Sequence, residues 1–397
     1  MKIGIYNQPS SGGIGGSESV AAFLAEALAG EHQVDLLHHI GGLSADVLEG
    51  ALGANLRGVQ LCYVEPEYGD RTPYFRNPWR RYQSARDWYA GLSEPYDLFI
   101  AIVHFTPPFC HARNGALIVL FPFDTADHIR PPAELATLPA YRRQLELWYQ
   151  RWVWQKRMSS YAVKTAISNF SHLWTRRRWA VDCEIVYPPV ASDFQQAVKS
   201  KIVLSVGRFA LEGEGHTKRQ PEMLTSFREM AEAGTSGGWQ YYCAGGLRDT
   251  PRHQEFFRTL FSMASATQAH VIANARREEL KGLFARASIF WHAAGYGEDE
   301  QATPELAEHF GISTVEAMAA GCVPVVINKG GQSEIVQHGL SGFLWNTLDE
   351  LKEYTALLIS DEALRKKMSE AARERAQLFE KQNSLNQHMS LLQPLLS

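Results

Sequence analysis

The 397-residue sequence has few of the features that mark several common protein classes. Its five cysteines are scattered with no paired spacing, which argues against a disulfide framework and against a zinc site. No apolar run approaches the roughly 20 residues that a membrane span needs. The first residues, MKIGIYNQPSSGG, are typical of a first strand rather than of a signal peptide. We therefore expect a cytoplasmic protein.

An excess of charge of one sign is also missing. The formal net charge is −4, so the sequence gives no electrostatic reason to expect binding to nucleic acid. Three ligand-binding signatures are absent as well: a Gly-x-Gly-x-x-Gly fingerprint, a Gly-Lys-Ser/Thr phosphate loop, and an Asp-x-Asp pair at a strand end. A dinucleotide site, a Walker-type nucleotide site and a carboxylate-held metal site therefore lack their usual sequence support.

What the sequence does contain is a repeated alternation of short apolar strands with helical patterns. Continuous apolar strands joined by crossover helices predict parallel sheets that are covered on both faces. The pattern restarts after Pro188-Pro189, with IVLSVGRF as the next strand. We therefore predict an α/β protein with two Rossmann-like, doubly wound domains, and we expect ligands at the carboxyl ends of the strands.

A glycine-rich loop follows the first strand. The segment NQPSSGGIGGSES holds Gly12, Gly13, Gly15 and Gly16 just before the next helix. Glycines let the backbone approach a ligand closely, and the free amides of a helix N-terminus favour an anion. We interpret the segment as an anion-binding or substrate-closing loop, with a flexible turn as the alternative.

Cations gather after the strand IVLSVGRF. Arg208 follows that strand directly, and after a polar loop Lys218 and Arg219 begin the next helix. The dipole and free amides of a helix start already favour negative charge. These positions favour a phosphate site over a solvated basic face.

A histidine and two glutamates lie at further strand ends. His104 ends the apolar strand FIAIVH, where a histidine is most often structural and catalysis is the alternative. Later, Ser313 or Thr314 is a candidate cap for a helix that carries Glu316 in its first turn. A carboxylate there can accept two hydrogen bonds from a vicinal diol, and Glu308 in the preceding loop would lie nearer the other end of the same ligand. The alternative is a capping carboxylate and a surface carboxylate.

A ligand with a diphosphate, a diol and further hydroxyls would satisfy all of these strand ends, and a sugar nucleotide is such a ligand. The segment EHFGISTVEAMAAGCVPVVINKGGQSEIVQHGLSGFLW resembles the signature of glycosyltransferase family 4, retaining enzymes among the group 1 glycosyltransferases. The family pattern is Glu, seven residues, Glu, then Ala-Met-Ala-x-Gly and a later Gly-Gly-x-x-Glu. The matching residues are Glu308, Glu316, Ala317, Met318, Ala319, Gly321, Gly330, Gly331 and Glu334. VGRF…KRQ, YPPV and GGIGGSE also resemble family segments.

The resemblance implies a GT-B fold, in which the two domains face each other across a cleft. Residues 1–190 would bind the acceptor, 191–375 would bind the nucleotide sugar, and a helix in 376–397 would pack back on the first domain. Glu316 would bind the donor ribose and Glu308 the donor sugar, while His104 would contact that sugar near its anomeric carbon. The longer loop here leaves open whether Lys218 or Arg219 reaches the phosphate.

The implied site residues fall into two sets. The catalytic set is His104, Arg208, Lys218 and Glu308. The donor-binding set is Gly15, Gly16, Arg208, Lys218, Arg219, Glu308, Phe310, Gly311, Ile312, Ser313, Thr314 and Glu316.

The implied activity is retaining transfer of a hexose from a nucleotide-diphosphate sugar, either GDP-mannose or a UDP-sugar. The acceptor would be a hydroxyl of a glycan, a lipid-linked molecule or a small molecule. We expect no cofactor and no metal, because Arg208 and Lys218 supply the positive charge. The alternatives are a sugar-nucleotide-binding GT-B protein of another class, either an epimerase or a non-catalytic subunit, and an NAD-dependent oxidoreductase.

One aromatic and basic stretch, YRRQLELWYQRWVWQKRMSSYAV, has two interpretations. Its tryptophans and cations, from Trp148 to Arg157 and including Trp152 and Trp154, would form a peripheral contact with the inner face of the membrane for a lipid-linked acceptor. A helix that packs its tryptophans into the N-terminal domain explains the stretch as well.

Overall fold

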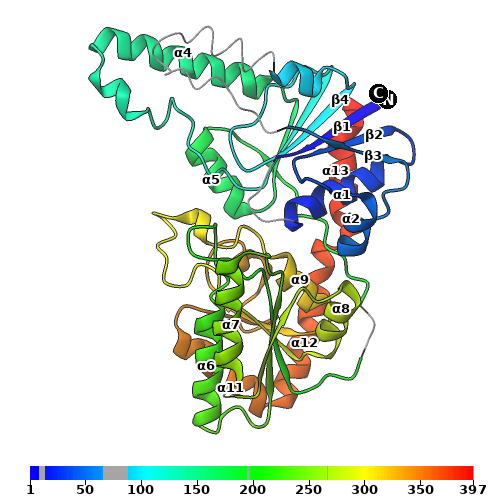
Figure 1. Cartoon of the computed structure of the whole chain (residues 1–397), viewed down its shortest axis with the longest axis vertical. Coiled ribbons are helices and arrows are strands. Elements are labelled where there is room, and N and C mark those ends of the chain that lie inside the picture. The colour runs from blue at the N-terminus through cyan, green and yellow to red at the C-terminus, as the bar shows by residue number, and fades with distance from the viewer. Residues whose placement is uncertain (9–13, 66–87, 195–196, 266, 397) are drawn as a thin grey trace. The chain divides into compact units, whose positions relative to one another are not determined.

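The computed structural model describes residues 1–8, 14–65, 88–194, 197–265 and 267–396. The chain divides into two compact units, coloured from blue to green and from green to orange in Figure 1. Unit 1 comprises Met1–Tyr187 together with Ser384–Ser397, and unit 2 comprises Pro188–Asn383. Each unit is described by itself below.

Unit 1 is built on a seven-stranded sheet in which all neighbouring strands are parallel. The strand order is β3-β2-β1-β4-β5-β6-β7. The strands are β1 (Lys2–Asn7), β2 (Gln33–His38), β3 (Val59–Tyr63), β4 (Leu98–Val103), β5 (Asn114–Val119), β6 (Val163–Ala166) and β7 (Glu184–Ile185). Its helices include α1 (Gly16–Leu28), α2 (Ala45–Leu52), α4 (Ala140–Ser159), α5 (Asn169–Trp179) and α13 (Lys381–Leu392), which begins in unit 2.

Unit 2 repeats the plan with a six-stranded parallel sheet of order β10-β9-β8-β11-β12-β13. Its strands are β8 (Ile202–Val206), β9 (Gln240–Gly245), β10 (Ala269–Ala273), β11 (Ile289–His292), β12 (Val323–Ile327) and β13 (Phe343–Trp345). Its helices are α6 (Gln220–Glu232), α7 (Pro251–Ser265), α8 (Arg277–Arg286), α9 (Ile312–Ala319), α10 (Gln332–Ile335), α11 (Leu348–Ser360) and α12 (Glu362–Ala376).

Both strand orders reverse direction once. In unit 1 the chain builds outward from β1 through β2 and β3 and then resumes on the other side at β4; in unit 2 the same happens between β8 and β11. Such a switch point leaves a crevice at the carboxyl ends of the two central strands, which is where ligands of this fold bind. The predicted pair of Rossmann-like, doubly wound parallel-sheet domains is confirmed.

The central strands are buried because helices cover both faces of each sheet. Every residue of β4 and of β12 is buried, as the continuous apolar runs in the sequence predict. The strand ends of unit 2 also approach closely: a Cβ on Gly245 would lie 1.9 Å from the carbonyl oxygen of Gly207. Only glycine at that position allows β9 to end beside β8 in this way.

Helix α4 packs one of its faces against the sheet of unit 1. Gln150, Trp154 and Met158 are its buried residues, and the indole Nε1 of Trp154 donates to the carbonyl of Trp179 at 2.9 Å. The guanidinium of Arg157 lies 4.6 Å from the centre of the Phe109 ring. The predicted membrane face is therefore wrong for Trp154 and Arg157, whose spacing from Gln150 puts them on or beside the core-facing stripe of the helix.

The C-terminal segment returns to unit 1, as predicted. The Ser384 hydroxyl donates to the carbonyl of Tyr187 at 2.6 Å, and the Asn114 side chain donates to the carbonyl of Leu395 at 2.9 Å. On the unit 2 side of the crossing, the Lys381 amide donates to the carbonyl of Val190 at 2.8 Å. The segment that holds Tyr187 and Val190 is therefore hydrogen-bonded to the segment that holds Lys381 and Ser384, once within unit 1 and once within unit 2.

Candidate active site

The candidate site of unit 2 lies at the carboxyl ends of β8 and β11, the switch point of that sheet. Gly207 and Arg208 follow β8, and His292 is the last residue of β11. A Cβ on Gly207 would lie 2.7 Å from Cγ of Lys218, so the glycine makes room for the lysine stem beside the strand end. The fold thereby brings a lysine of the next loop back to the end of the strand.

Three basic groups converge on one carboxylate oxygen there. Glu308 Oε2 forms an ion pair with Lys218 Nζ, accepts a hydrogen bond from His292 Nε2 at 2.9 Å, and lies 3.8 Å from His216 Nε2. The side chains of Glu308 and Lys218 are 14% and 15% exposed. A largely buried carboxylate with this many partners is fixed in position and in charge.

The electrostatics keep Glu308 ionised. Burial alone would raise the pKa of its carboxyl, but the Lys218 ammonium, with His216 and the hydrogen bond from His292, holds that pKa well below the usual range. Burial lowers the pKa of His216 and of His292, so both imidazoles are neutral at pH 7. Since a carboxylate can only accept, Nε2 of His292 carries the proton of that hydrogen bond. Glu308 is therefore an acceptor of hydrogen bonds and not an acid.

Gly330 and Gly331 contact the backbone of the loop that carries Glu308. The Gly331 amide donates to the carbonyl of Glu308 at 2.8 Å. A Cβ on Gly330 would lie 2.2 Å from the same carbonyl oxygen, and Gly330 has a φ of 59°. Glycine at both positions allows this close backbone contact, which fixes the backbone of Glu308 in place.

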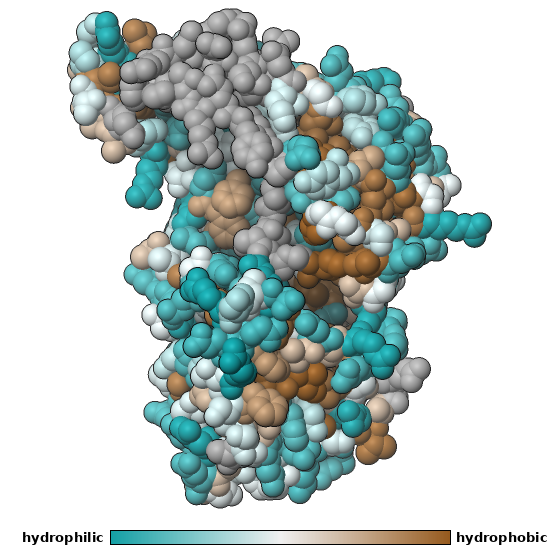
Figure 2. Space-filling model, in the orientation of Figure 1, coloured by the Kyte–Doolittle hydropathy of each residue, from teal (hydrophilic) through white to brown (hydrophobic). Residues whose placement is uncertain are grey.

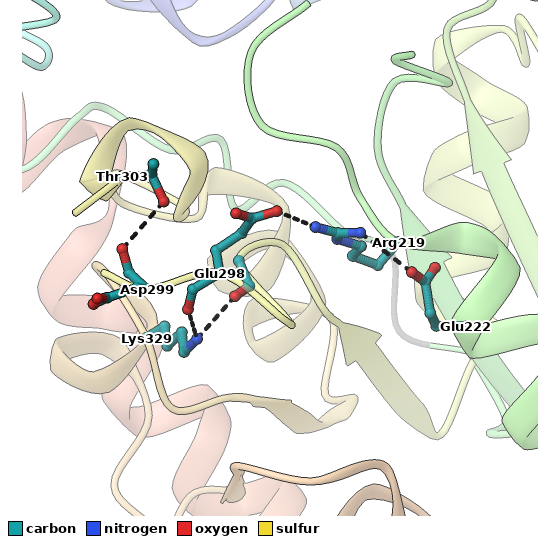
Figure 3. Close-up of polar contacts among 7 residues, drawn as sticks. Arg219, Glu222, Glu298, Asp299, Thr303 and Lys329 are labelled. Carbon is teal, nitrogen blue, oxygen red and sulfur yellow. Dashed lines mark hydrogen bonds and ion pairs between the residues drawn. The ribbon is translucent and has the colours of Figure 1, made fainter. Parts of the chain in front are cut away.

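Arg219 lies in a different network, drawn in Figure 3. Its guanidinium forms an ion pair with Glu298 and lies 3.4 Å from Oε1 of Glu222. Lys329 Nζ donates to the carbonyls of Glu298 and, at 3.0 Å, of Gly295. We call these residues the Glu298 clamp. The clamp connects the segments that follow β8, β11 and β12. Arg219 pairs with the carboxylates of Glu222 and Glu298, whereas Lys218 is the cation that contacts Glu308.

Arg208 is the second cation of the site. Its carbonyl accepts from the Gln220 side chain at 3.0 Å, which fixes its backbone. Within the described ranges no carboxylate forms an ion pair with its guanidinium, which is half-buried. Arg208 and Lys218 together give the crevice two positive charges, only one of which is neutralised by Glu308.

The N-terminus of α9 differs from the prediction. Gly311 is the N-cap, with a φ of 123°, and no side chain caps the helix, so the prediction of Ser313 or Thr314 as the cap is wrong. A Cβ on Gly311 would also lie 2.5 Å from Nε2 of Gln332, which leaves glycine as the fitting residue. Ile312 and Ser313 are half-buried and Thr314 is fully buried.

Glu316 lies beyond the first turn of α9, which holds no acidic residue, so that part of the prediction is wrong too. Burial is the main cause that raises the pKa of Glu316 to about 7, and the nearby Asp193 raises it further. Arg277 and Lys281 lower that pKa, but by less. Lys281 Nζ forms an ion pair with Asp193 at 2.6 Å. Glu316 therefore titrates near neutrality within a small charged group formed by α8, α9 and Asp193 of the segment before β8.

The side chain of Phe310 points into the core of unit 2. It is 2% exposed, and its ring lies 5.6 Å from the ring of Phe379. Only the backbone of Phe310 is left to contact a ligand.

The predicted residues of unit 1 lie at the switch point of its own sheet. His104 directly follows β4, and its ring stacks on Phe123 with centroids 5.0 Å apart. The Gln8 side chain accepts from the backbone amides of His104 and Phe105 at 2.9 and 2.8 Å. Gly15 is the N-cap of α1, and its amide donates to Glu18 at 2.8 Å. Gly16 begins that helix, while Gly12 and Gly13 lie outside the described residues.

His292 and His216, the two histidines next to the Glu308 carboxylate, were not predicted from the sequence. His292 ends an apolar strand, the same signal that singled out His104, so it was there to be found. His216 lies in the polar loop before α6, and nothing in its neighbourhood distinguishes it.

Comparisons with known proteins find relatives of part of the chain and solved structures that share its fold. A sequence profile described as "Glycosyl transferases group 1" matches residues 191–375. A GDP-Man:Man(3)GlcNAc(2)-PP-Dol alpha-1,2-mannosyltransferase of Dictyostelium discoideum is 28% identical over 243 residues, which are 57% of this chain and 45% of that protein. The chain thus spans about half the length of the curated relative that it matches.

Solved structures share the fold over the whole chain. A glycosyltransferase from Rickettsia africae aligns with a TM-score of 0.66 and 14% identity, over 100% of this chain and 98% of its own. HepE from Anabaena, solved in complex with UDP and glucose, aligns with a TM-score of 0.64 and 17% identity, over 99% and 100%. These likenesses confirm the predicted GT-B fold. The profile match covers the part of the chain that carries Glu308 and Glu316, so unit 2 is similar to the group 1 glycosyltransferases.

Proposed function

We propose that the protein is a retaining, metal-independent hexosyltransferase of glycosyltransferase family 4. It takes a hexose from a nucleotide-diphosphate sugar and attaches it to a hydroxyl of a glycan, lipid-linked or small-molecule acceptor. Unit 2 binds the donor and unit 1 binds the acceptor.

The observation that carries this proposal is the group of Lys218, Glu308 and Arg208 at the switch point of unit 2. A sugar nucleotide brings a diphosphate for the two cations and sugar hydroxyls for an ionised carboxylate. In the ligand-free protein Lys218 and Glu308 neutralise each other. A bound donor would offer a separate partner to each, so binding exchanges one ion pair for two charge-assisted contacts.

The same groups account for the chemistry. The bond between the anomeric carbon and the diphosphate breaks, and the diphosphate leaves with its electron pair and gains negative charge. Arg208 and Lys218 stabilise that charge, and they do so without a bound metal. The acceptor oxygen forms the new bond on the same face of the sugar, and its proton passes to an oxygen of the leaving diphosphate. Retention follows from this front-face attack.

The names of two similar proteins support the two donors that we propose. The Dictyostelium protein is named for GDP-mannose and a dolichol-linked acceptor, and HepE was solved with UDP and glucose. We therefore propose GDP-mannose or a UDP-sugar as the donor. Glu316 would hold the ribose diol, because a carboxylate accepts from two adjacent hydroxyls.

The proposal includes a cytoplasmic location. The five cysteines are all free, which agrees with a reducing compartment. None of the described helices is both long enough and apolar enough to cross a membrane.

A thermal-shift panel tests the donor assignment. GDP, UDP, ADP and their sugar conjugates are added to the wild-type protein, to Glu316→Ala, and to Glu353→Ala as a control at an exposed glutamate of α11. One nucleotide should raise the melting temperature of the wild type and of the control, but not of Glu316→Ala. If no nucleotide shifts the wild type, the donor site is wrong. Release of free sugar or transfer from the binding donor then separates a transferase from a non-catalytic binding protein.

A further inference from the structure

Helix α4 carries a second, exposed stripe that the transferase site does not use. Tyr141, Leu145 and Trp148 are 62%, 63% and 66% exposed, and the half-buried Trp152 continues their row. Their spacing of four, three and four residues puts them on one side of the helix. Leu145 and the buried Trp154 are nine residues apart, or two and a half turns, so the stripe lies opposite the face that packs on unit 1.

The stripe therefore points away from the core of unit 1. Figure 1 shows α4 as a long helix that projects to the side of that unit's sheet. Figure 2, in the same orientation, shows hydrophobic and hydrophilic residues side by side in this region, at the upper left. Aromatic and aliphatic side chains that are more than three-fifths exposed in one row are unusual on a surface that faces only water.

Cations flank the stripe. Arg142, Arg151 and Lys156 are exposed on the two sides of it, and Glu146 is the one acidic residue in the helix. The whole protein has a net charge of −4, so this helix opposes the overall charge. A second copy of the chain on the same face would bring two such sets of cations together, which argues against a homodimer.

We propose that this stripe docks the protein on an anionic bilayer surface. The three exposed apolar side chains enter the headgroup region, and the three flanking cations contact lipid phosphates. This adds to the proposed function, on which its biological meaning rests, since a lipid-linked acceptor lies at such a surface. The docking itself does not require that any sugar be transferred.

Vesicle flotation with the full chain tests the proposal. The probes are vesicles of phosphatidylcholine alone and vesicles of phosphatidylcholine with phosphatidylglycerol. We expect binding to the anionic vesicles only, weakening as salt is added. The double substitution Leu145→Ser/Trp148→Ser should lower the partition coefficient by roughly tenfold or more, because two large apolar side chains no longer leave water.

The controls use the same changes elsewhere. Phe261→Ser removes an equally exposed aromatic ring from α7 (59% exposed), and Lys367→Glu reverses an exposed cation on α12. Both should bind vesicles as the wild type does, whereas Arg142→Glu/Arg151→Glu should not. Because all changed side chains are exposed, the melting temperatures should be unchanged.

Three results would overturn the proposal. One is a wild type that does not float with anionic vesicles, and another is a stripe variant that floats as well as the Phe261→Ser control. The third is a dimer in light scattering that the stripe substitutions convert to a monomer, which would assign the stripe to a second copy. Donor hydrolysis measured in vesicle-free buffer reports on the transferase site separately, and it should be the same in all of these variants.

Discussion

The two units have the same strand plan but fill their switch points differently. In unit 2 the ends of β8 and β11 hold paired charges, with Glu308 between Lys218 and His292. In unit 1 the ends of β1 and β4 are joined through amides, since the Gln8 side chain accepts from the backbone of His104 at 2.9 Å, and the carboxylate nearby, Glu18 of α1, accepts from Asn7 at 3.0 Å.

Under the proposed function, this difference corresponds to the two tasks of donor binding and acceptor binding. A site that stabilises a leaving diphosphate needs fixed charges, because charge develops there during the reaction. A site that orients a hydroxyl needs neutral donors and acceptors, since these can be satisfied by water before the acceptor binds. Unit 1 lines a cavity of about 50 Å³ with the neutral side chains of Asn7 and Gln8, with His38, and with one carboxylate, Glu18. This comparison can be tested by changing corresponding positions in the two units.

The largest effect is expected from Lys218→Ala. Loss of the cation should lower kcat roughly 100- to 1,000-fold, because the leaving group loses one fixed charge. Gln8→Ala, at the corresponding strand end of unit 1, should cost roughly tenfold or less. Steady-state transfer rates at saturating donor measure both, with Lys201→Ala as the exposed-lysine control. Equal losses for Lys218→Ala and Gln8→Ala would remove the distinction between the two switch points.

The Glu298 clamp should give the next effect. Arg219→Ala frees the segment that leads to Glu308, and we expect kcat to fall roughly 30-fold, or about 2 kcal/mol, because small misplacements of catalytic groups are costly. The exchange Arg219→Glu/Glu298→Arg restores an ion pair between the same positions and should recover much of that loss. The Lys329 bonds go to backbone carbonyls, so the exchange leaves them intact. If Arg219 bound the phosphate instead, the exchanged protein would be as poor as Arg219→Glu alone.

The two helix N-termini form a matched pair for stability. Gly311→Ala should reduce the free energy of unfolding by about 2 kcal/mol, since φ at this position is 123° and the new Cβ meets Gln332. Gly15→Ala should change it by less than ~0.5 kcal/mol, because φ is −159° and the nearest atom is 3.7 Å away. Denaturant titration of both variants measures the contrast. A Gly15→Ala protein that is stable but inactive would show that the loop touches a substrate.

The smallest effect concerns pH and is confined to unit 2. The pKa of Glu316 in the free protein is about 7, and the ionised form is the one that accepts from a diol. Donor affinity should therefore weaken by up to about tenfold per pH unit as pH falls below 7, and level off above it. Calorimetric titrations between pH 6 and pH 8 measure the slope. Glu316→Gln, which cannot titrate, should bind with a flat profile, and a wild-type slope in that variant would assign the titration to another group.

The sequence predicted the frame of this protein well. Parallel strands covered on both faces leave continuous apolar runs, and such runs marked β4, β8 and β12 correctly. The residues just after those strands were then natural candidates for the site. Arg208 was selected in this way, whereas Lys218 was selected at the next helix start and Glu308 in the loop before the helix of Glu316; the fold brings the last two together.

What the sequence could not predict depends on long-range geometry. Lys218 and Glu308 are 90 residues apart, and only the strand order makes them partners. Gly311 caps α9 because the chain enters that helix with a positive φ, which the sequence ISTVE does not reveal. The division of labour between Lys218 and Arg219 depends on Glu298, a residue whose sequence neighbourhood resembles an ordinary acidic loop.

The hydrogen bond between Ser384 and Tyr187 has a consequence for how such proteins diversify. Unit 2 is one uninterrupted stretch of chain, and the residues on either side of it are held 2.6 Å apart, from hydroxyl to carbonyl, within unit 1. Unit 2 is therefore a continuous insertion whose two ends lie next to each other. A recombination event could replace the whole of unit 2 through two neighbouring junctions without changing the register of any strand in the sheet of unit 1.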